Sequence, residues 1–213
     1  QSLDFRRAIG DRAGEATTLN NLGMAVVDAG DTARAIGLYD SSLAILSELG
    51  FENRKASVLN NIAAAHIALG DNVKAAEFSR MALPLYRAAS DSTGEATALN
   101  NIGLASSGSG DAQIAFEYLS DALISARSSM SRGLEAIILR NLMRTSGQLK
   151  RPAMAVVFGK QCIGTYQDLR ARISELDSST QRNYINSIEY NYRYLADLLI
   201  ELGRFTEATA ILD

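Results

Sequence analysis

One cysteine and one histidine are the only residues of this chain that suggest nucleophilic catalysis. Cys162 would supply the thiol, and His66 the base that takes its proton. Both fall where the chain elsewhere has packing residues: Cys162 takes the position of Ala122 one repeat earlier, and His66 that of Val26. They also belong to the fourth and second repeat units, which do not meet in a linear array. We therefore predict no catalytic residue.

Asparagine pairs are the second pattern with chemical meaning. They recur at one fixed step, as Asn20-Asn21, Asn60-Asn61 and Asn100-Asn101, with Asn141 as a lone fourth member. An amide offers two donors and an acceptor, so a row of amides can hold the backbone of an extended peptide whatever its sequence. The alternative is that the amides satisfy backbone groups of a neighbouring helix.

Small and apolar residues accompany the asparagines. One turn further along lie Met24, Ala64 and Leu104, which suit a partner with apolar side chains. In the fourth unit two cations replace this pattern, because Arg140 and Arg144 lie one turn apart on the same face of a helix. They could receive a carboxylate from a partner. Alternatively they are a solvated pair, or they contact a further domain.

Composition excludes several other classes of function. The chain has 213 residues, a formal net charge of −3, and a hydrophobic share of 47% that is ordinary for a globular protein. No clustered basic face favours nucleic acid, and no apolar run approaches the roughly 20 residues that cross a bilayer. With one histidine and one cysteine, no metal site and no cofactor are expected. The lone Cys162 and the absence of a signal peptide favour a reducing, cytoplasmic location.

The elements that position these residues repeat every 40 residues. Leu19-Asn20-Asn21-Leu22-Gly23 returns as Leu59-Asn60-Asn61-Ile62-Ala63 and Leu99-Asn100-Asn101-Ile102-Gly103, and in altered form as Leu139-Arg140-Asn141-Leu142-Met143. Each unit is predicted to form two helices. The first ends at a glycine such as Gly30, which takes the left-handed conformation, and Asp31 caps the second. One such hairpin cannot bury its apolar face alone, so the units must stack.

We predict one all-α array covering residues 1–213. Its parts are the end of an earlier repeat (1–10), four repeats (13–50, 53–90, 93–130 and 133–174), and a last partial repeat (178–213). Because both ends fall inside a repeat, we expect the array to be a fragment of a longer protein.

The spacing of small and large residues resembles that of tetratricopeptide (TPR) proteins, in particular the 40-residue kinesin-light-chain and Pins-like branches. The positions that match are Leu19, Leu22, Gly23, Val26, Ala35 and Tyr39; Leu59, Ile62, Ala63, His66 and Ala75; Leu99, Ile102, Gly103 and Ala115; and Tyr192, Leu195, Ala196, Leu199 and Ala208. The resemblance implies a right-handed helical-hairpin solenoid. It also implies that the first helices, with their asparagines, line a concave groove that binds a protein or peptide segment.

The fourth unit departs from this pattern. Met143 replaces the small residue, Gly159 falls where an aromatic is expected, and Lys150 and Arg151 replace the Gly-Asp corner. Extra length between Thr165 and Arg182 predicts longer helices there. In the second unit, Pro84 is expected to kink its helix by removing one hydrogen bond.

A second resemblance concerns the last 45 residues or so. Leu169-Arg170, Gln181-Arg182, Tyr194–Leu199, Gly203-Arg204 and Glu207-Ala208 are similar to the segment that precedes the caspase-like domain of bacterial CHAT proteins. This implies that the array is the regulatory arm of such a peptidase, with its own downstream domain as a partner. The alternatives are a free-standing adaptor and the sensor arm of a bacterial transcription regulator. Oligomeric state does not follow from these residues.

Overall fold

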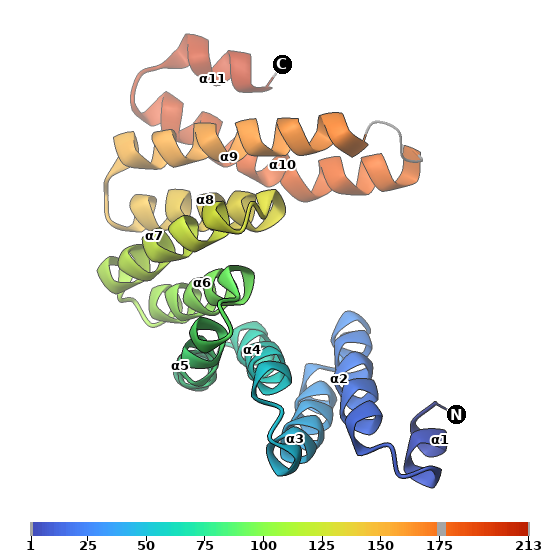
Figure 1. Ribbon diagram of the computed structural model, residues 1–213. Helices are drawn as coiled ribbons and strands as arrows, with labels where there is room; N and C mark the ends of the chain where they lie inside the picture. The colour runs from blue at the N-terminus through green and yellow to red at the C-terminus, as the bar shows by residue number, and fades with distance from the viewer. Residues whose placement is uncertain (1, 174–177, 213) are drawn as a thin grey trace. The chain divides into compact units, whose positions relative to one another are not determined.

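The computed structural model describes residues 2–173 and 178–212, with side chains over 3–170 and 188–212. In these ranges the protein is all-α, and helices joined by short turns follow one another without a strand (Figure 1). The helices are α1 (Ser2–Ala8), α2 (Arg12–Asp28), α3 (Thr32–Leu49), α4 (Glu52–Ala68), α5 (Asn72–Ala88), α6 (Ser92–Gly108), α7 (Ala112–Ser128), α8 (Arg132–Gln148), α9 (Pro152–Ile173), α10 (Ser178–Glu201) and α11 (Phe205–Leu212).

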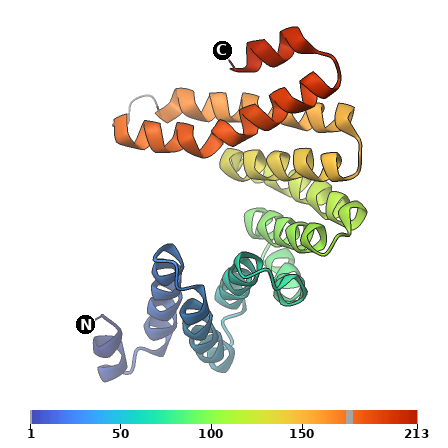
Figure 2. The same ribbon diagram turned by 180° about the vertical axis from the view of Figure 1, so that it is seen from behind.

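The chain forms two compact units, residues 1–111 with α1 to α6 and residues 112–213 with α7 to α11. In the first unit α2 packs on α3 and α4 on α5, and the first helices α4 and α6 also touch each other. In the second unit α8 packs on α9, and α9 and α10 run side by side in both views (Figures 1 and 2). The predicted all-α hairpin solenoid is confirmed.

A left-handed residue separates consecutive helices from α1 to α9, and another separates α10 from α11. Glycine holds this conformation at 10, 30, 50, 70, 110 and 203, with φ between 70° and 91°. Aspartates begin several of the following helices, and the side chain of Asp31 accepts a hydrogen bond from the backbone N–H of Arg34 at 3.1 Å. The predicted Gly-Asp corner is therefore confirmed. Ser90, Met130 and Lys150 adopt the same conformation without being glycine.

Complementary sizes pack the two helices of the first and fourth hairpins. In the first repeat a Cβ on Gly23 would lie 2.4 Å from the ring of Tyr39, so only glycine admits this tyrosine. In the fourth repeat the sizes are exchanged: a Cβ on Gly159 would lie 2.8 Å from the Met143 sulfur. The departures noticed in the sequence of the fourth repeat thus compensate each other across one contact.

Small residues let the helices approach closely at a second repeated position. The Ser42 hydroxyl donates to the carbonyl of Ala16 at 2.8 Å, and both residues are fully buried. The same contact in the fourth repeat is made by the Cys162 thiol, which donates to the carbonyl of Ala136 at 3.4 Å. Cys162 is therefore a packing residue, as its position in the repeat predicts.

Two helices depart from the regular length. α9 has 22 residues and α10 has 24, compared with 17 in α4, α5, α6, α7 and α8, which confirms the expected extension around Thr165. Residues 174–177 and the side chains of Gln181 and Arg182 lie outside the described parts. α5 remains one helix through Pro84, whose side chain faces solvent. The kink expected there stays a prediction.

Met130 provides a test of how the corners contribute to stability. It has φ 54° and an exposed fraction of 85%, so its side chain contributes little packing while its Cβ strains the backbone. Met130→Gly should stabilise the second unit by about 1 kcal/mol relative to Met130→Ala. Urea unfolding followed by circular dichroism measures the difference. Equal midpoints for the two variants would show that the left-handed corner is not strained.

Candidate functional site

The asparagines of the first unit join neighbouring repeats through their side chains. Asn61 Nδ2 on α4 donates to Asn20 Oδ1 on α2 at 2.9 Å, and Asn101 Nδ2 on α6 donates to Asn60 Oδ1 on α4 at 2.9 Å. We call these two bonds the amide rungs. Each rung links the second asparagine of one repeat to the first asparagine of the repeat before it, so the rungs hold the first helices in register.

Each rung uses only part of its amides. Asn20 and Asn60 accept through oxygen, which leaves their NH2 groups, and Asn61 donates through nitrogen, which leaves its carbonyl. The Asn20 NH2 meets only the Met24 sulfur, at 4.0 Å. These three asparagines are half-buried, so donors and an acceptor remain at the surface of α2 and α4.

The predicted groove residues differ in exposure. On α2, Asn21 is exposed and makes no hydrogen bond within the described ranges, and Met24 has an exposed fraction of 49%. On α6, Asn100 and Asn101 are buried and Leu104 is half-buried. The open part of the asparagine face is therefore the part on α2 and α4, which we call the first-helix face.

A cavity of about 230 Å³ lies in this face between α2 and α4. Thr17 and Asn20 of α2 and Arg54 and Ser57 of α4 contribute polar groups. Leu46 of α3 lies behind them. The complete lining is Ala16, Thr17, Asn20, Ser42, Leu46, Arg54, Ser57 and Val58.

The two arginines of the fourth repeat lie on α8 in the second unit. Arg140 is half-buried, and its Nε is buried without a hydrogen-bond partner, whereas Arg144 is exposed. Asn141 beside them is buried and interacts with another group. Burial raises the pKa of the Tyr194 hydroxyl, the charge of Tyr190 raises it further, and Arg144 opposes them. Arg144 of α8 is therefore close enough to Tyr194 of α10 for its charge to affect the pKa of that hydroxyl.

A stacked tyrosine pair was not predicted from the sequence. The rings of Tyr190 and Tyr194 lie 6.1 Å apart with an interplanar angle of 11°. The two tyrosines are four residues apart, a spacing that places side chains next to each other on a helix and could have predicted the contact. Tyr192 packs against the core of the second unit, in agreement with its place in the repeat. The side chain of Tyr184 lies outside the described parts.

Neither Cys162 nor His66 is placed for catalysis. Burial raises the pKa of the Cys162 thiol to about 12, although Arg140 opposes this, so the thiolate that a nucleophile needs is not formed near neutral pH. His66 stacks on Phe78 with ring centroids 5.6 Å apart. Its Nδ1 lies 3.5 Å from a carboxylate oxygen of Asp71, at the helix corner.

Ion pairs between consecutive helices form a repeated feature that the sequence reasoning missed. Arg7 pairs with Glu15 at 2.7 Å, and Arg127 pairs with Glu135 at 2.8 Å. Arg87 and Glu95 make the same contact at 2.7 Å. The signal was present, because these arginines and glutamates recur at the repeat period, with the second repeat as the exception.

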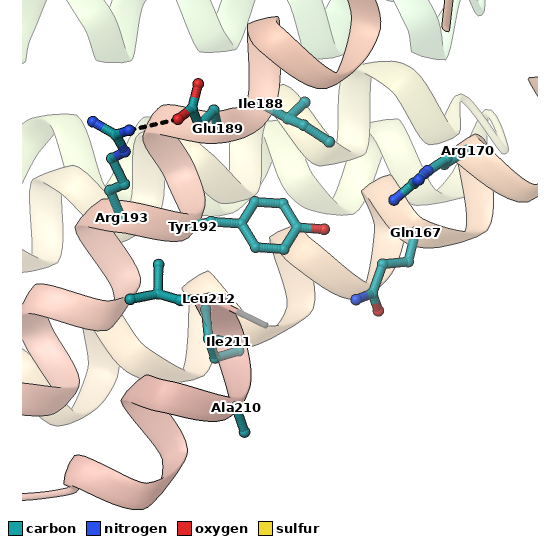
Figure 3. A pocket seen from close by; sticks show the side chains of 9 residues that line it. All are labelled: Gln167, Arg170, Ile188, Glu189, Tyr192, Arg193, Ala210, Ile211 and Leu212. Atoms are coloured by element: carbon teal, nitrogen blue, oxygen red, sulfur yellow. Dashed lines mark hydrogen bonds and ion pairs between the residues drawn. The ribbon is translucent and has the colours of Figure 1, made fainter. Parts of the chain in front are cut away.

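A cavity near the end of the chain lies between α9, α10 and α11 (Figure 3). It measures about 460 Å³ and is lined by Gln167, Arg170, Ile188, Glu189, Tyr192, Arg193, Ala210, Ile211 and Leu212. In the second repeat, the position of Tyr192 is held by Leu59, which packs against Ala82 and Tyr86 in the last turns of α5. The cavity lies beside the described residues of α11. We assign no ligand to it.

Membrane-spanning helices and metal-binding clusters are both absent from the described residues. No described helix is long and apolar enough to cross a membrane. Within the same ranges, histidine, cysteine, aspartate and glutamate nowhere gather in a group that would hold a metal ion.

Comparison with known proteins agrees with the repeat pattern. Tetratricopeptide-repeat family models match residues 16–49 and residues 54–128. A search of curated proteins finds no match. With the hairpins described above, the matches define a tetratricopeptide-repeat solenoid.

Solved structures share this fold at low sequence identity. BtubC (BKLC) from P. vanneervenii has a TM-score of 0.81 and 19% identity, covering 100% of this chain and 84% of that one. A putative kinesin light chain from Podospora anserina with nearly identical TPR-like repeats has a TM-score of 0.67 and 16% identity, covering 92% and 90%. A Rap protein complexed with competence and sporulation factor has a TM-score of 0.72 and 15% identity, covering 94% of this chain and 52% of that one.

The amide rungs predict a difference between two adjacent asparagines. Asn61→Ala removes a rung and should destabilise the first unit by about 1 kcal/mol relative to Asn21→Ala. Both substitutions change helix propensity equally, so their difference isolates the rung. Urea unfolding of the two variants measures it. If Asn21→Ala is as destabilising as Asn61→Ala, the rungs do not hold the repeats in register.

Proposed function

We propose that this protein is a scaffold that binds a peptide segment of a protein partner along the first-helix face of α2 and α4. The proposal rests on which groups of the asparagine amides are already hydrogen-bonded and which are not. The rungs fix the amides in place, and the NH2 groups of Asn20 and Asn60 and the carbonyl of Asn61 remain for a ligand. A peptide backbone presents complementary carbonyl and N–H groups at every residue.

Two of the structures with this fold were solved with a peptide or peptide factor bound. One is the Rap protein complexed with competence and sporulation factor, and the other is the Rap conjugation gene regulator of plasmid pLS20 in complex with the Phr* peptide. Their identity to this chain is 15% in both cases, so they support the class of ligand and not its sequence.

Arg140 and Arg144 form a second element of the proposal. An unpartnered Nε on Arg140 and an exposed guanidinium on Arg144, one turn apart on α8, suit an acidic side chain of the partner. The neighbouring Asn141 is buried, so we assign it a supporting place beside the arginines.

A regulatory arm of a CHAT-type peptidase is the more specific form of this proposal. It rests on the residues from Tyr194 to Leu199 and on Gly203-Arg204, and the adaptor and the transcription-regulator arm are its alternatives. The residues that follow Asp213 in the gene test it. An α/β domain with a histidine and a cysteine at neighbouring strand ends supports the peptidase, and any other continuation rejects it.

A peptide-selection experiment tests the binding proposal. A random peptide library displayed on phage is selected on the full chain, and the affinities of the selected peptides are measured by fluorescence anisotropy. Asn20→Asp and Asn60→Asp keep the oxygen that accepts the rung but remove the outward NH2 donors. We expect the double variant to bind about tenfold more weakly, which corresponds to about 1.4 kcal/mol, with an unchanged unfolding midpoint.

The control adds negative charge on a second helix instead. Gln161→Glu on α9 lies at an exposed position where the side chain already accepts from Arg127 at 2.9 Å, so the added carboxylate keeps its partner and should leave peptide affinity unchanged. If the Asn20→Asp/Asn60→Asp variant binds the peptides as tightly as the unaltered chain, the amides do not hold the peptide.

A further inference from the structure

Asn191 of α10 carries a buried amide without a partner. Its exposed fraction is 1%, and within the described ranges neither its Nδ2 nor its Oδ1 has a hydrogen-bond partner. Buried amides are normally paired, because an amide that leaves water without gaining a new partner destabilises the folded state. The packing of α10 in the second unit therefore buries a polar group at a cost in free energy.

Apolar residues hold this position in the three preceding repeats. Because Tyr192 takes the place of Leu59, Asn191 takes the place next to it. The equivalent residues of the second, third and fourth repeats are Val58, Ala98 and Ile138. Their exposed fractions are 2% or less, so the position is a core position of the array. Asn191 is a polar departure from it at one junction.

The α8 side of the same junction also has an unpaired polar group. The Nε of Arg140 is buried without a hydrogen-bond partner. Arg140 takes the place of Asn20 and Asn60, which accept the amide rungs of the first unit, and Tyr194 takes the place of the donor. No amide rung can therefore join α10 to α8. Close packing joins them instead, because a Cβ on Gly147 would lie 2.4 Å from the Tyr194 hydroxyl.

We propose that the hairpin of α10 and α11 is a detachable element, which opens from α8 and α9 while these two helices stay folded. In the opened form water hydrates the Asn191 amide and the Arg140 guanidinium, so the cost of burying them is relieved. Such an opening is a local unfolding step of one cooperative part of a fold. It switches Arg140 between a covered and an open state. The inference goes beyond the proposed peptide binding and does not depend on it.

Cys162 is a natural reporter of this opening. It is the only cysteine of the chain, it is fully buried, and it takes the place of Ser42. At the first junction Ser42 and Val58 line one cavity, so Cys162 and Asn191 hold neighbouring positions at theirs. Burial raises the pKa of the Tyr192 hydroxyl, and the nearby Cys162 raises it further, which agrees with this placement beside α10. A thiol reagent therefore reaches Cys162 once α10 moves away.

Thiol labelling of the full chain measures the opening. The reagent is dithiobis(nitrobenzoic acid), a disulfide that the cysteine thiolate attacks with release of a coloured thiolate. Asn191→Val copies the residue of the second repeat and removes the unpaired amide. We expect it to slow the labelling of Cys162 at least about tenfold, which corresponds to about 1.4 kcal/mol in the opening equilibrium. If Asn191→Val is labelled as fast as the unaltered chain, the proposal is overturned.

The first junction supplies the matched control. Cys162→Ser/Ser42→Cys moves the thiol to the equivalent position of the first repeat, where the rung is present and Val58 is apolar. Adding Val58→Asn to this variant should speed the labelling at least about tenfold. Each comparison keeps its thiol in place, so the reactivity of the thiol itself cancels. Unchanged labelling after Val58→Asn would show that a buried amide at this position does not open a junction.

Urea separates the local opening from unfolding of the whole unit. The labelling is repeated at urea concentrations below the unfolding transition that circular dichroism records. A local opening exposes less surface than unfolding does, so the labelling rate should rise less steeply with urea than the unfolding equilibrium. Equal slopes would mean that Cys162 reacts only when the unit unfolds, and they would reject the detachable hairpin. If Asn191→Val is poorly folded, Asn191→Ile, which copies Ile138, replaces it.

The labelling needs no peptide, so its outcome is separate from the test of the proposed function. Peptide binding that depends on Asn20 and Asn60, together with labelling that does not respond to Asn191→Val, would leave the scaffold function standing and reject the detachable hairpin. Labelling that slows in Asn191→Val, with peptide affinity unaffected by the asparagines, would support the detachable hairpin and reject the amide face.

Discussion

A helical hairpin of this sequence cannot bury its apolar face alone, and the close approach of its two helices is what makes stacking possible. The approach depends on small residues, as in the contact between Ala16 and Ser42, and on matched sizes, as between Gly23 and Tyr39. In the fourth repeat the large residue, Met143, is on the first helix and the glycine, Gly159, is on the second. The pairing of a large with a small residue is therefore kept, whichever helix carries the large one. Left-handed corners then return the chain at a fixed step.

The proposed peptide-binding face follows from this packing. The first helices of neighbouring repeats lie in register. Asn61 Nδ2 of the second repeat therefore reaches Asn20 Oδ1 of the first repeat at 2.9 Å. The same regularity makes departures informative. Leu46 stands where the next repeat has Tyr86 and is one of the residues lining a cavity of about 230 Å³, and Arg140 stands where the earlier repeats have asparagine and has a buried Nε without a hydrogen-bond partner.

The repeat period was sufficient to predict the helices, their corners and the packing role of Cys162, because these depend on local residue types such as Gly30 and Asp31. It did not predict which asparagines face solvent. Asn21 and Asn101 hold the same position in their repeats, yet one is exposed and the other is buried in a rung. The rungs and the cavity depend on contacts between repeats. Whether two side chains meet there depends on their lengths and on the residues around them, and the pattern within one repeat does not contain that information.

The central claim is that the first-helix face, held by amide rungs, is the surface that receives the partner. The most direct measurement is a crystal structure of the full chain with a library-selected peptide. We predict that peptide backbone carbonyls accept hydrogen bonds from the NH2 groups of Asn20 and Asn60, that the Asn61 oxygen accepts from a peptide N–H, and that both rungs remain intact. A peptide bound on the second helices α3 and α5, with the asparagine amides untouched, would contradict it.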